Sequence, residues 1–216
     1  MENTNTFKVQ STSSNLISLN VTPGHYATSS SHINYYIDMT SLKSRRSEAH
    51  AAAKVKVRAT PYAATTIIDT IVCLDGTNVI GAYLADELLN TGILSANLHN
   101  TAYIISPEQH SGGQLIFREN YLSMIKGKHV LVLLATATTG KTLQTALECI
   151  EYYGGEVVGV SSIFSAADEI HDEQINTIFR TEDIPNYETH SAADCPLCKA
   201  GIPIKGIINS HGYSSL

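Results

Sequence analysis

Seven consecutive residues, Thr136 to Thr142 with the sequence TATTGKT, combine the residue types that bind a phosphate group. Small residues let the backbone curl so that several N–H groups point into one concavity, which attracts anions. The hydroxyl groups of Thr138, Thr139 and Thr142 can donate further hydrogen bonds. The GxxxxGK[ST] spacing of a Walker loop is absent. The segment predicts a phosphate-monoester site, and the alternative is an ordinary strand-to-helix turn capped by threonines.

The segments on either side of this loop are typical of a strand and a helix. Apolar residues run without interruption from Val130 to Ala135, as in a strand that is buried on both faces. After the loop, four apolar residues share one face at helical spacing: Leu143, Ala146, Leu147 and Ile150. Val157 to Ile163 predicts the next parallel strand. The loop therefore opens a helix, whose N-terminus adds partial positive charge.

A second strand–loop–helix unit precedes the first. Thr70 to Leu74 reads as a short buried strand, and Ile80 to Leu89 reads as an amphipathic helix. Between them, Asp75 and Gly76 are typical of a tight turn, and Thr77 can cap the helix. The alternative is that this segment is a standard connecting loop with no ligand.

The repetition of such units predicts the fold class. Strands are expected to begin near Thr70, Ala102, Val130 and Val157, with a long helix over residues 41–60 and a short helix or a connection over residues 63–68. We therefore expect an α/β protein with a central parallel sheet and helices on both faces. A polar lead-in over residues 1–14 precedes a single domain over residues 15–216. Pro23 and Gly24 predict a turn before a strand at Tyr35 to Ile37.

Length, charge and apolar content narrow the function further. The chain has 216 residues and a formal net charge of −6, and its basic residues form no large block, so binding to nucleic acid is not expected. No apolar run approaches the roughly 20 residues of a membrane-spanning helix. The polar N-terminal sequence MENTNTFKVQ lacks the apolar core of a signal peptide, so a cytoplasmic location is expected.

The four cysteines fall into two groups. Cys73 and Cys149 lie in apolar segments and are expected to be buried thiols. Cys195 and Cys198 form a CxxC pair in the sequence CPLCKAGIP, within a C-terminal tail that begins near Pro185. A zinc site needs four ligands, and no second CxxC exists, although His190 and His211 are nearby. We expect reduced structural thiols, with a metal site or a redox pair as open alternatives.

The strand, the TATTGKT loop, the helix and the GGEVVGV sequence together resemble the signature of type I phosphoribosyltransferases. This resemblance implies that residues Thr136, Ala137, Thr138, Thr139, Gly140, Lys141 and Thr142 hold the 5-phosphate of phosphoribosyl diphosphate (PRPP). It implies a pyrophosphate site at Asp75, Gly76 and Thr77, and Mg²⁺ bound together with PRPP. Two acidic residues normally end the strand and hold the ribose hydroxyls. The alignment on TTG places Leu134 and Ala135 at those positions.

Other segments are similar to the orotate phosphoribosyltransferases within that family. The CPLC tail matches some of them, and residues 15–40 resemble their small N-terminal hood, to which the tail adds. In orotate phosphoribosyltransferases a loop after the third strand carries an HG pair and closes over PRPP. His110, with Gly112 and Gly113, resembles this pair, which implies a catalytic role for His110. The resemblance also implies orotate as the base and a homodimer.

Two functions follow from this resemblance. The first is transfer of the phosphoribosyl group of PRPP to a nitrogenous base, with release of pyrophosphate. The second is a catalytically weak or inactive regulatory module that binds PRPP or a nucleotide. The second is favoured by Leu134 and Ala135, because neither side chain can hold the ribose as a carboxylate does. Weak or absent orotate phosphoribosyltransferase activity is expected.

Overall fold

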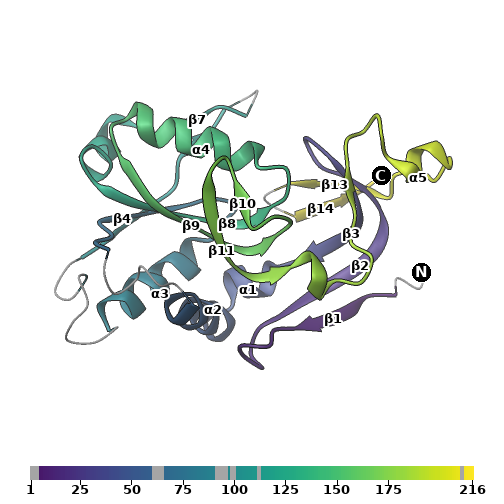
Figure 1. Cartoon of the computed structure of the whole chain (residues 1–216), viewed down its shortest axis with the longest axis horizontal. Helices are drawn as coiled ribbons and strands as arrows, with labels where there is room; N and C mark the ends of the chain where they lie inside the picture. The colour runs from purple at the N-terminus through teal and green to yellow at the C-terminus, as the bar shows by residue number, and fades with distance from the viewer. Residues whose placement is uncertain (1–4, 60–65, 91–96, 98–100, 111–112, 210–211) are drawn as a thin grey trace.

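A sheet of parallel strands forms the centre of the protein (Figure 1). The structure is a computed structural model, and it describes residues 5–59, 66–90, 97, 101–110, 113–209 and 212–216. The sheet has the order β10 (Glu169–Ile170), β11 (Glu173–Arg180), β9 (Glu156–Ser165), β8 (His129–Ala137), β4 (Thr70–Cys73) and β5 (Tyr103–Ile105). All neighbouring pairs are parallel except β10 with β11. The predicted central parallel sheet is therefore confirmed.

Strand β8 lies between β4 and β9 and explains the long apolar run in the sequence. Its side chains alternate between the two faces of the sheet, and both faces are covered. On one face the cluster includes Leu131, Leu133 and Ala135. On the other face the cluster includes Val132 and Leu134. The strand is apolar and buried from Val130 to Ala135 because both faces are covered there, whereas Thr136 at its carboxyl end is exposed.

Helices cover the two faces of this sheet. One face carries α1 (Thr40–Ser44), α2 (Arg46–Ala59) and α3 (Asn78–Leu89), and the other carries α4 (Lys141–Tyr152) and the 3₁₀ helix η1 (Glu119–Met124) (Figure 1). The single helix expected over residues 41–60 is wrong, because Arg45 has an extended backbone that separates α1 from α2. The first helix begins at Thr40, whose N–H donates to the Asp38 carboxylate at 2.9 Å.

A second sheet joins the two ends of the chain and forms the hood. Its strands have the order β12 (Thr189–His190), β3 (His32–Asp38), β2 (Ser18–Ala27), β13 (Gly206–Asn209) and β14 (Gly212–Ser215), and β1 (Phe7–Gln10) also pairs with β2. The turn predicted at Pro23 and Gly24 is wrong. Strand β2 continues through them, with a register shift between Pro23 and Tyr26. Proline is tolerated there because a bulge does not need its missing N–H.

The remaining segments connect these layers. After β5 the chain forms a hairpin of β6 (Glu108–Gln109) and β7 (Leu115–Ile116). The 3₁₀ helix η2 (Thr181–Asp183) follows β11, and α5 (Pro196–Lys199) lies in the tail. Residues 63–68, expected to form a short helix or a connection, fall partly outside the described residues, and residues 66–68 are not helical. Among the helices that are described, none is both long enough and apolar enough to cross a membrane.

Candidate functional site

A cavity of about 170 Å³ lies where the carboxyl ends of β4 and β8 meet the hood. All seven residues of the predicted phosphate loop, Thr136–Thr142, line it. The hood contributes the turn at residues 28–30 and part of β3, and the tail contributes Ile208, Asn209 and Gly212. Lys43 and Asp75 complete the wall. Ligands of open α/β sheets bind at this edge, outside the carboxyl ends of the strands.

The phosphate loop has the conformation that a binding site for an anion requires. Gly140 is the N-cap of α4 and has φ of 76°, a left-handed backbone that favours glycine. A Cβ atom at this position would lie 2.3 Å from Cγ2 of Ile170. A side chain is therefore disfavoured both by the positive φ and by the overlap with Ile170. Thr139, Lys141 and Thr142 are exposed, with their side chains available at the start of α4. The loop thus presents hydroxyls beside the positive end of a helix dipole.

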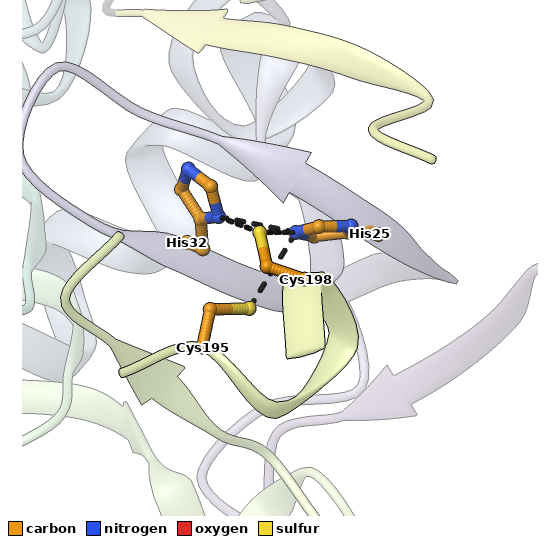
Figure 2. Close-up of side chains that lie close together, drawn as sticks. All are labelled: His25, His32, Cys195 and Cys198. Carbon is orange, nitrogen blue, oxygen red and sulfur yellow. Dashed lines mark hydrogen bonds between the residues drawn. The ribbon is translucent and has the colours of Figure 1, made fainter. Parts of the chain in front are cut away.

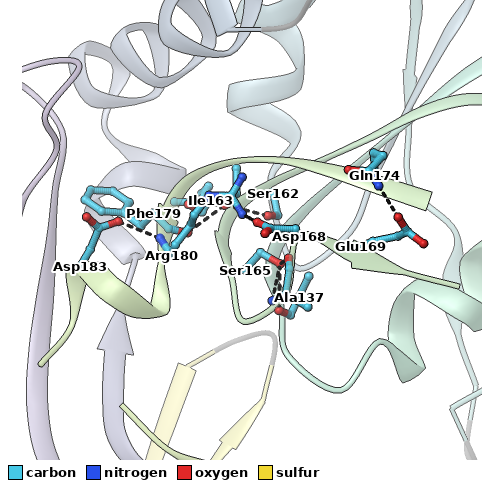
Figure 3. A network of polar contacts seen from close by, with 12 residues as sticks. Ala137, Ser162, Ile163, Ser165, Asp168, Glu169, Gln174, Phe179, Arg180 and Asp183 are labelled. Atoms are coloured by element: carbon cyan, nitrogen blue, oxygen red, sulfur yellow. Dashed lines mark hydrogen bonds and ion pairs between the residues drawn. The ribbon is translucent and has the colours of Figure 1, made fainter. Parts of the chain in front are cut away.

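Neighbouring strands hold this loop in place. The carbonyl of Ala137 accepts the backbone N–H of Ala166 at 2.8 Å and the Ser165 hydroxyl at 3.3 Å (Figure 3). On the other side, the hydroxyl group of Ser30 in the hood lies 3.3 Å from the hydroxyl group of Thr139 in the loop, and the two share a hydrogen bond. The loop is therefore supported by β9 from the sheet and contacted by the hood from the other side.

Lys43 and Asp75 form the opposite wall of the cavity. The amine of Lys43 donates to the backbone carbonyl of Asp75 at 2.9 Å. The carboxylate of Asp75 accepts the backbone N–H groups of Ala135 and Thr136. Burial raises the pKa of the Asp75 carboxyl, although Lys43 and the two N–H groups act to lower it. Burial likewise lowers the pKa of Lys43, against the attraction of Asp75 and Asp38.

The three residues predicted to bind pyrophosphate have different environments. Asp75 and Gly76 form the expected tight turn, with φ of 54° and 76°. Of the three, only Asp75 lines the cavity. Thr77 is fully buried, and its hydroxyl donates to the carbonyls of Leu74 at 2.8 Å and Leu133 at 3.1 Å. The side chain of Thr77 thus fixes the turn to β8. Pyrophosphate binding by Thr77 stays a prediction, and its buried hydroxyl does not face the cavity.

The two positions of the missing acids are buried. Leu134 is 1% exposed and Ala135 is 4% exposed, and they pack into the cores on opposite faces of the sheet. A carboxylate nevertheless reaches this strand end, because Asp75 accepts the N–H of Ala135 from the neighbouring loop. The sequence contained Asp75, but only the pairing of β4 beside β8 shows where its carboxylate lies.

Part of the chain is similar in sequence to known phosphoribosyltransferases. No protein-family model matches the chain. The chain is 35% identical over 79 residues to the orotate phosphoribosyltransferase of Caldanaerobacter subterraneus subsp. tengcongensis, which is 37% of this chain and 40% of that protein. It is 31% identical over 97 residues to the orotate phosphoribosyltransferase of Desulforamulus reducens, which is 44% of this chain and 48% of that protein. The matches thus span less than half of these relatives.

Solved structures extend the likeness to most of the chain. The orotate phosphoribosyltransferase of Mycobacterium tuberculosis in complex with inorganic phosphate has a TM-score of 0.50 at 17% identity, covering 70% of this chain and 80% of that one. The adenine phosphoribosyltransferase of Thermoanaerobacter pseudethanolicus has a TM-score of 0.51 at 13% identity, covering 68% and 88%. This chain has the type I phosphoribosyltransferase fold. The predicted fold class and the resemblance to orotate phosphoribosyltransferases are confirmed.

His110 lies outside the cavity of this phosphoribosyltransferase fold. It follows β6, in a hairpin where the Arg118 guanidinium binds both oxygens of the Glu108 carboxylate at 2.9 and 2.6 Å. The hairpin packs on α4 through Leu115, whose carbonyl accepts the Cys149 thiol at 3.3 Å, two turns away from the phosphate loop. The catalytic role of His110 therefore stays a prediction that this conformation does not support. Gly112 lies outside the described residues.

Cys195 and Cys198 have partners that the sequence did not reveal. They converge with His25 and His32 of the hood, and we name these four residues the His–Cys cluster (Figure 2). His190, the candidate nearest in sequence, instead lies 3.1 Å from the Glu188 carboxylate, and His211 is outside the described residues. The signal that was available is the HYATSSSH sequence, which places a histidine on each side of the reversal between β2 and β3.

Proposed function

We propose that this protein binds PRPP in the cavity and transfers its phosphoribosyl group to a nitrogenous base, for which orotate is the first candidate. The observation that carries the proposal is the phosphate loop, since all of its residues line a cavity at the N-terminus of α4. The named relatives support the choice of reaction, and sequence similarity to orotate phosphoribosyltransferases supports the choice of base.

The two walls of the cavity suit the two ends of PRPP. The 5-phosphate would bind the loop at Thr138 to Thr142, where backbone N–H groups, hydroxyls and the helix dipole favour a dianion. The diphosphate would then extend toward the Lys43 amine, the cation of the opposite wall. In the reaction a nitrogen of the base bonds to C1 of the ribose as the bond from C1 to the diphosphate oxygen breaks. The electron pair of the broken bond leaves with pyrophosphate, and the proton of the base nitrogen is released to solvent.

The donors of the cavity fit the Mg²⁺ that accompanies PRPP. Asp75 is the one carboxylate among the described residues that line it. Mg²⁺ commonly keeps several waters and binds one or two carboxylates together with phosphate oxygens, so a single carboxylate is compatible. Bound in this way, the ion would shield the charge of the diphosphate. The protein residues would contribute binding and orientation of the two substrates.

We further propose that the Asp75 carboxylate takes over part of the role of the missing acids. It lies at the end of β8, where Leu134 and Ala135 replace them. One carboxylate in place of two would leave the ribose with fewer charge-assisted hydrogen bonds, each worth roughly 1.5–3 kcal/mol. If the one bond that is still missing acts in the transition state, the rate would be lower by a factor on the order of 10 to 10². Slow transfer is therefore expected.

A regulatory module that binds PRPP or a nucleotide without turnover is the second candidate. It is favoured by the burial of Leu134 and Ala135, because a strand end packed into two cores has no carboxylate of its own to offer the ribose. Such a module would still need the phosphate loop. The two candidates differ in turnover and not in binding.

Two measurements on the same preparation test both candidates. Isothermal titration with PRPP and Mg²⁺ measures binding, and formation of orotidine monophosphate from orotate and PRPP measures turnover. Binding with slow turnover supports the enzyme, and binding without turnover for any nucleobase selects the module. Absence of PRPP binding, together with absence of binding by ribose 5-phosphate and nucleoside monophosphates, would refute both. The predicted homodimer can be checked by light scattering on the same sample.

A further inference from the structure

Four potential metal ligands meet between the hood and the tail. His25 lies on β2 and His32 begins β3, whereas Cys195 and Cys198 flank and occupy the short helix α5. Their ligand atoms all lie within 4.8 Å of one another. Figure 2 shows that the two rings and the two thiols point toward a common centre. Because the ligands come from three separate segments, their convergence does not follow from the CxxC spacing alone.

Four of the six ligand-to-ligand distances in the cluster lie close to those of a tetrahedral zinc site. Sγ of Cys195 and Sγ of Cys198 lie 3.5 and 3.6 Å from Nε2 of His25. Nδ1 of His32 lies 3.2 Å from Sγ of Cys198 and 3.1 Å from Nε2 of His25. Zinc bonds of about 2.3 Å to sulfur and 2.0–2.1 Å to nitrogen, at tetrahedral angles, place ligand atoms roughly 3.3 to 3.8 Å apart. The other two pairs, Cys195 with Cys198 and Cys195 with His32, lie within 4.8 Å, so binding one ion requires the cluster to contract by at most about 1 Å.

A carbonyl group fixes the tautomer of His25. Its Nδ1 lies 2.8 Å from the backbone carbonyl of Ile202. A carbonyl only accepts, so Nδ1 carries the proton and Nε2 presents its lone pair to the cluster. Metal-binding histidines commonly donate their second N–H to a carbonyl or carboxylate, which orients the ring. His25 is therefore already oriented as a ligand.

We propose that His25, His32, Cys195 and Cys198 bind one zinc ion. Two imidazoles and two thiolates form one of the common sets in structural zinc sites, and four protein ligands leave no position open for a substrate. Two thiolates also balance the charge of the ion. A site of this kind would contribute to folding and would not take part in phosphoribosyl transfer.

The proposed zinc site would fasten the tail to the hood beside the cavity. The carbonyl of His25 accepts the N–H of Lys205 at 2.7 Å, and β13 begins to pair with β2 at Tyr26. Strand β13 then carries Ile208 and Asn209, which line the cavity. Loss of the metal would free the segment that leads into this wall. We therefore expect metal removal to weaken ligand binding while the parallel sheet stays folded.

The first experiment measures metal directly. The full chain, purified without chelators, is analysed by mass spectrometry for its metal content, and the metal-free chain is titrated with Co²⁺. One zinc per chain is expected, together with the visible absorption of tetrahedral Co²⁺ and a thiolate-to-cobalt charge-transfer band. A chain that carries no zinc and gives neither absorption would overturn the proposal. If Cys195 and Cys198 instead form a reversible disulfide and the chain binds no metal, the zinc proposal is overturned and the redox alternative is selected.

The second experiment assigns the ligands. Zinc affinity is measured by competition with a chromophoric chelator in C198S and His32→Gln, and each is expected to fall by a factor on the order of 10² or more. His190→Gln is the matched control, because His190 lies close in sequence to the cysteines but pairs with Glu188. Equal affinity in C198S and wild type would overturn the assignment, and so would a large loss in His190→Gln. If a ligand variant does not fold, the Co²⁺ titration of the wild-type chain still decides the proposal.

Discussion

The phosphate loop and the His–Cys cluster both gather polar groups around a point, but they are built in opposite ways. The loop consists of seven consecutive residues, and the parallel sheet and α4 hold it from both ends. The cluster joins residues as far apart as Cys198 and His25, 173 positions away in sequence. Closing a longer loop costs more chain entropy. A local site can be organised by the fold alone, whereas the cluster gains most from an ion that binds all four groups.

The first prediction concerns the core beneath the loop and has the largest expected effect. Replacing Leu134 and Ala135 by Asp restores the acidic pair of the family but places two carboxyls at buried positions. An uncompensated buried charge costs about 3–5 kcal/mol, so the free energy of unfolding should fall by at least that amount at neutral pH. Burial raises a carboxyl pKa, so the loss should shrink as the pH falls and both carboxyls become protonated.

Urea unfolding at neutral and at acidic pH measures this effect, with Leu134→Asn and Ala135→Asn as the uncharged comparison. If the doubly acidic variant is as stable as wild type at neutral pH, these positions can reach solvent. In that case, a rise in PRPP affinity in the same variant would show that the ribose lies against them. The zinc content should not change, because the His–Cys cluster lies in the other sheet.

The second prediction concerns Gly140. A valine there combines a positive φ with a β-branched side chain that would overlap Ile170. Several N–H groups would leave the concavity, and each hydrogen bond to a charged group is worth about 1.5–3 kcal/mol, so PRPP affinity should fall on the order of 10²-fold or more. Isothermal titration measures the loss. Gly140→Ala with Ile170→Ala removes the overlap but keeps the positive φ, and it should bind with intermediate affinity.

Normal PRPP affinity in the Gly140→Val variant would show that the phosphate binds elsewhere. Loss of zinc from the same variant would show that the loop and the cluster are not independent sites. The comparison between the two regions predicts instead that the Gly140→Val variant keeps its full zinc content while its PRPP affinity falls.

The same difference explains what could be predicted from the sequence. The loop, β8, α4 and β9 were predicted because continuous apolar runs and small residues act over a few positions. The break at Arg45 and the passage of β2 through Pro23 depend on packing and strand pairing, which the sequence does not display. His25 and His32 were missed for the same reason. Their role depends on which strand the tail joins, and only tertiary contacts determine that.

The third prediction concerns Asp75. Its pKa is raised in the folded state by burial, so this carboxyl stabilises the fold below the unfolded pKa of about 3.9 and loses that contribution as the pH rises through the folded value. Asp75→Asn should therefore be more stable than wild type at neutral pH, and the difference should disappear in acid. Thermal unfolding of wild type and Asp75→Asn, measured from neutral pH down to acid, tests the stability difference at neutral pH and its disappearance in acid.

Ligand binding in the same variant tests the proposed role of Asp75. A neutral amide replaces a charge-assisted hydrogen bond to the ribose by an ordinary one, a difference of roughly 1 kcal/mol, so PRPP affinity should fall about fivefold. Tighter binding of PRPP would contradict the proposal, because it would mean that the carboxylate repels the diphosphate. Asp38→Asn is a suitable control, since Asp38 also acts on Lys43 but is not among the described residues lining the cavity.

The smallest expected effect concerns the contact that joins the two regions. The hydroxyls of Ser30 and Thr139 lie 3.3 Å apart and connect the hood to the phosphate loop at an exposed position. A hydrogen bond that is exposed and 3.3 Å long contributes about 0.5 kcal/mol, the low end of the usual range, so Ser30→Ala should weaken PRPP binding by roughly twofold. Ser29→Ala, in the same turn and the same cavity wall, is the matched control. If the His–Cys cluster positions the hood through this contact, metal removal should weaken PRPP binding in wild type. In Ser30→Ala, where the contact is already lost, metal removal should cause only a small additional loss of PRPP affinity. Equal additional losses in both proteins would show that the zinc site acts on the cavity through the tail and not through this turn.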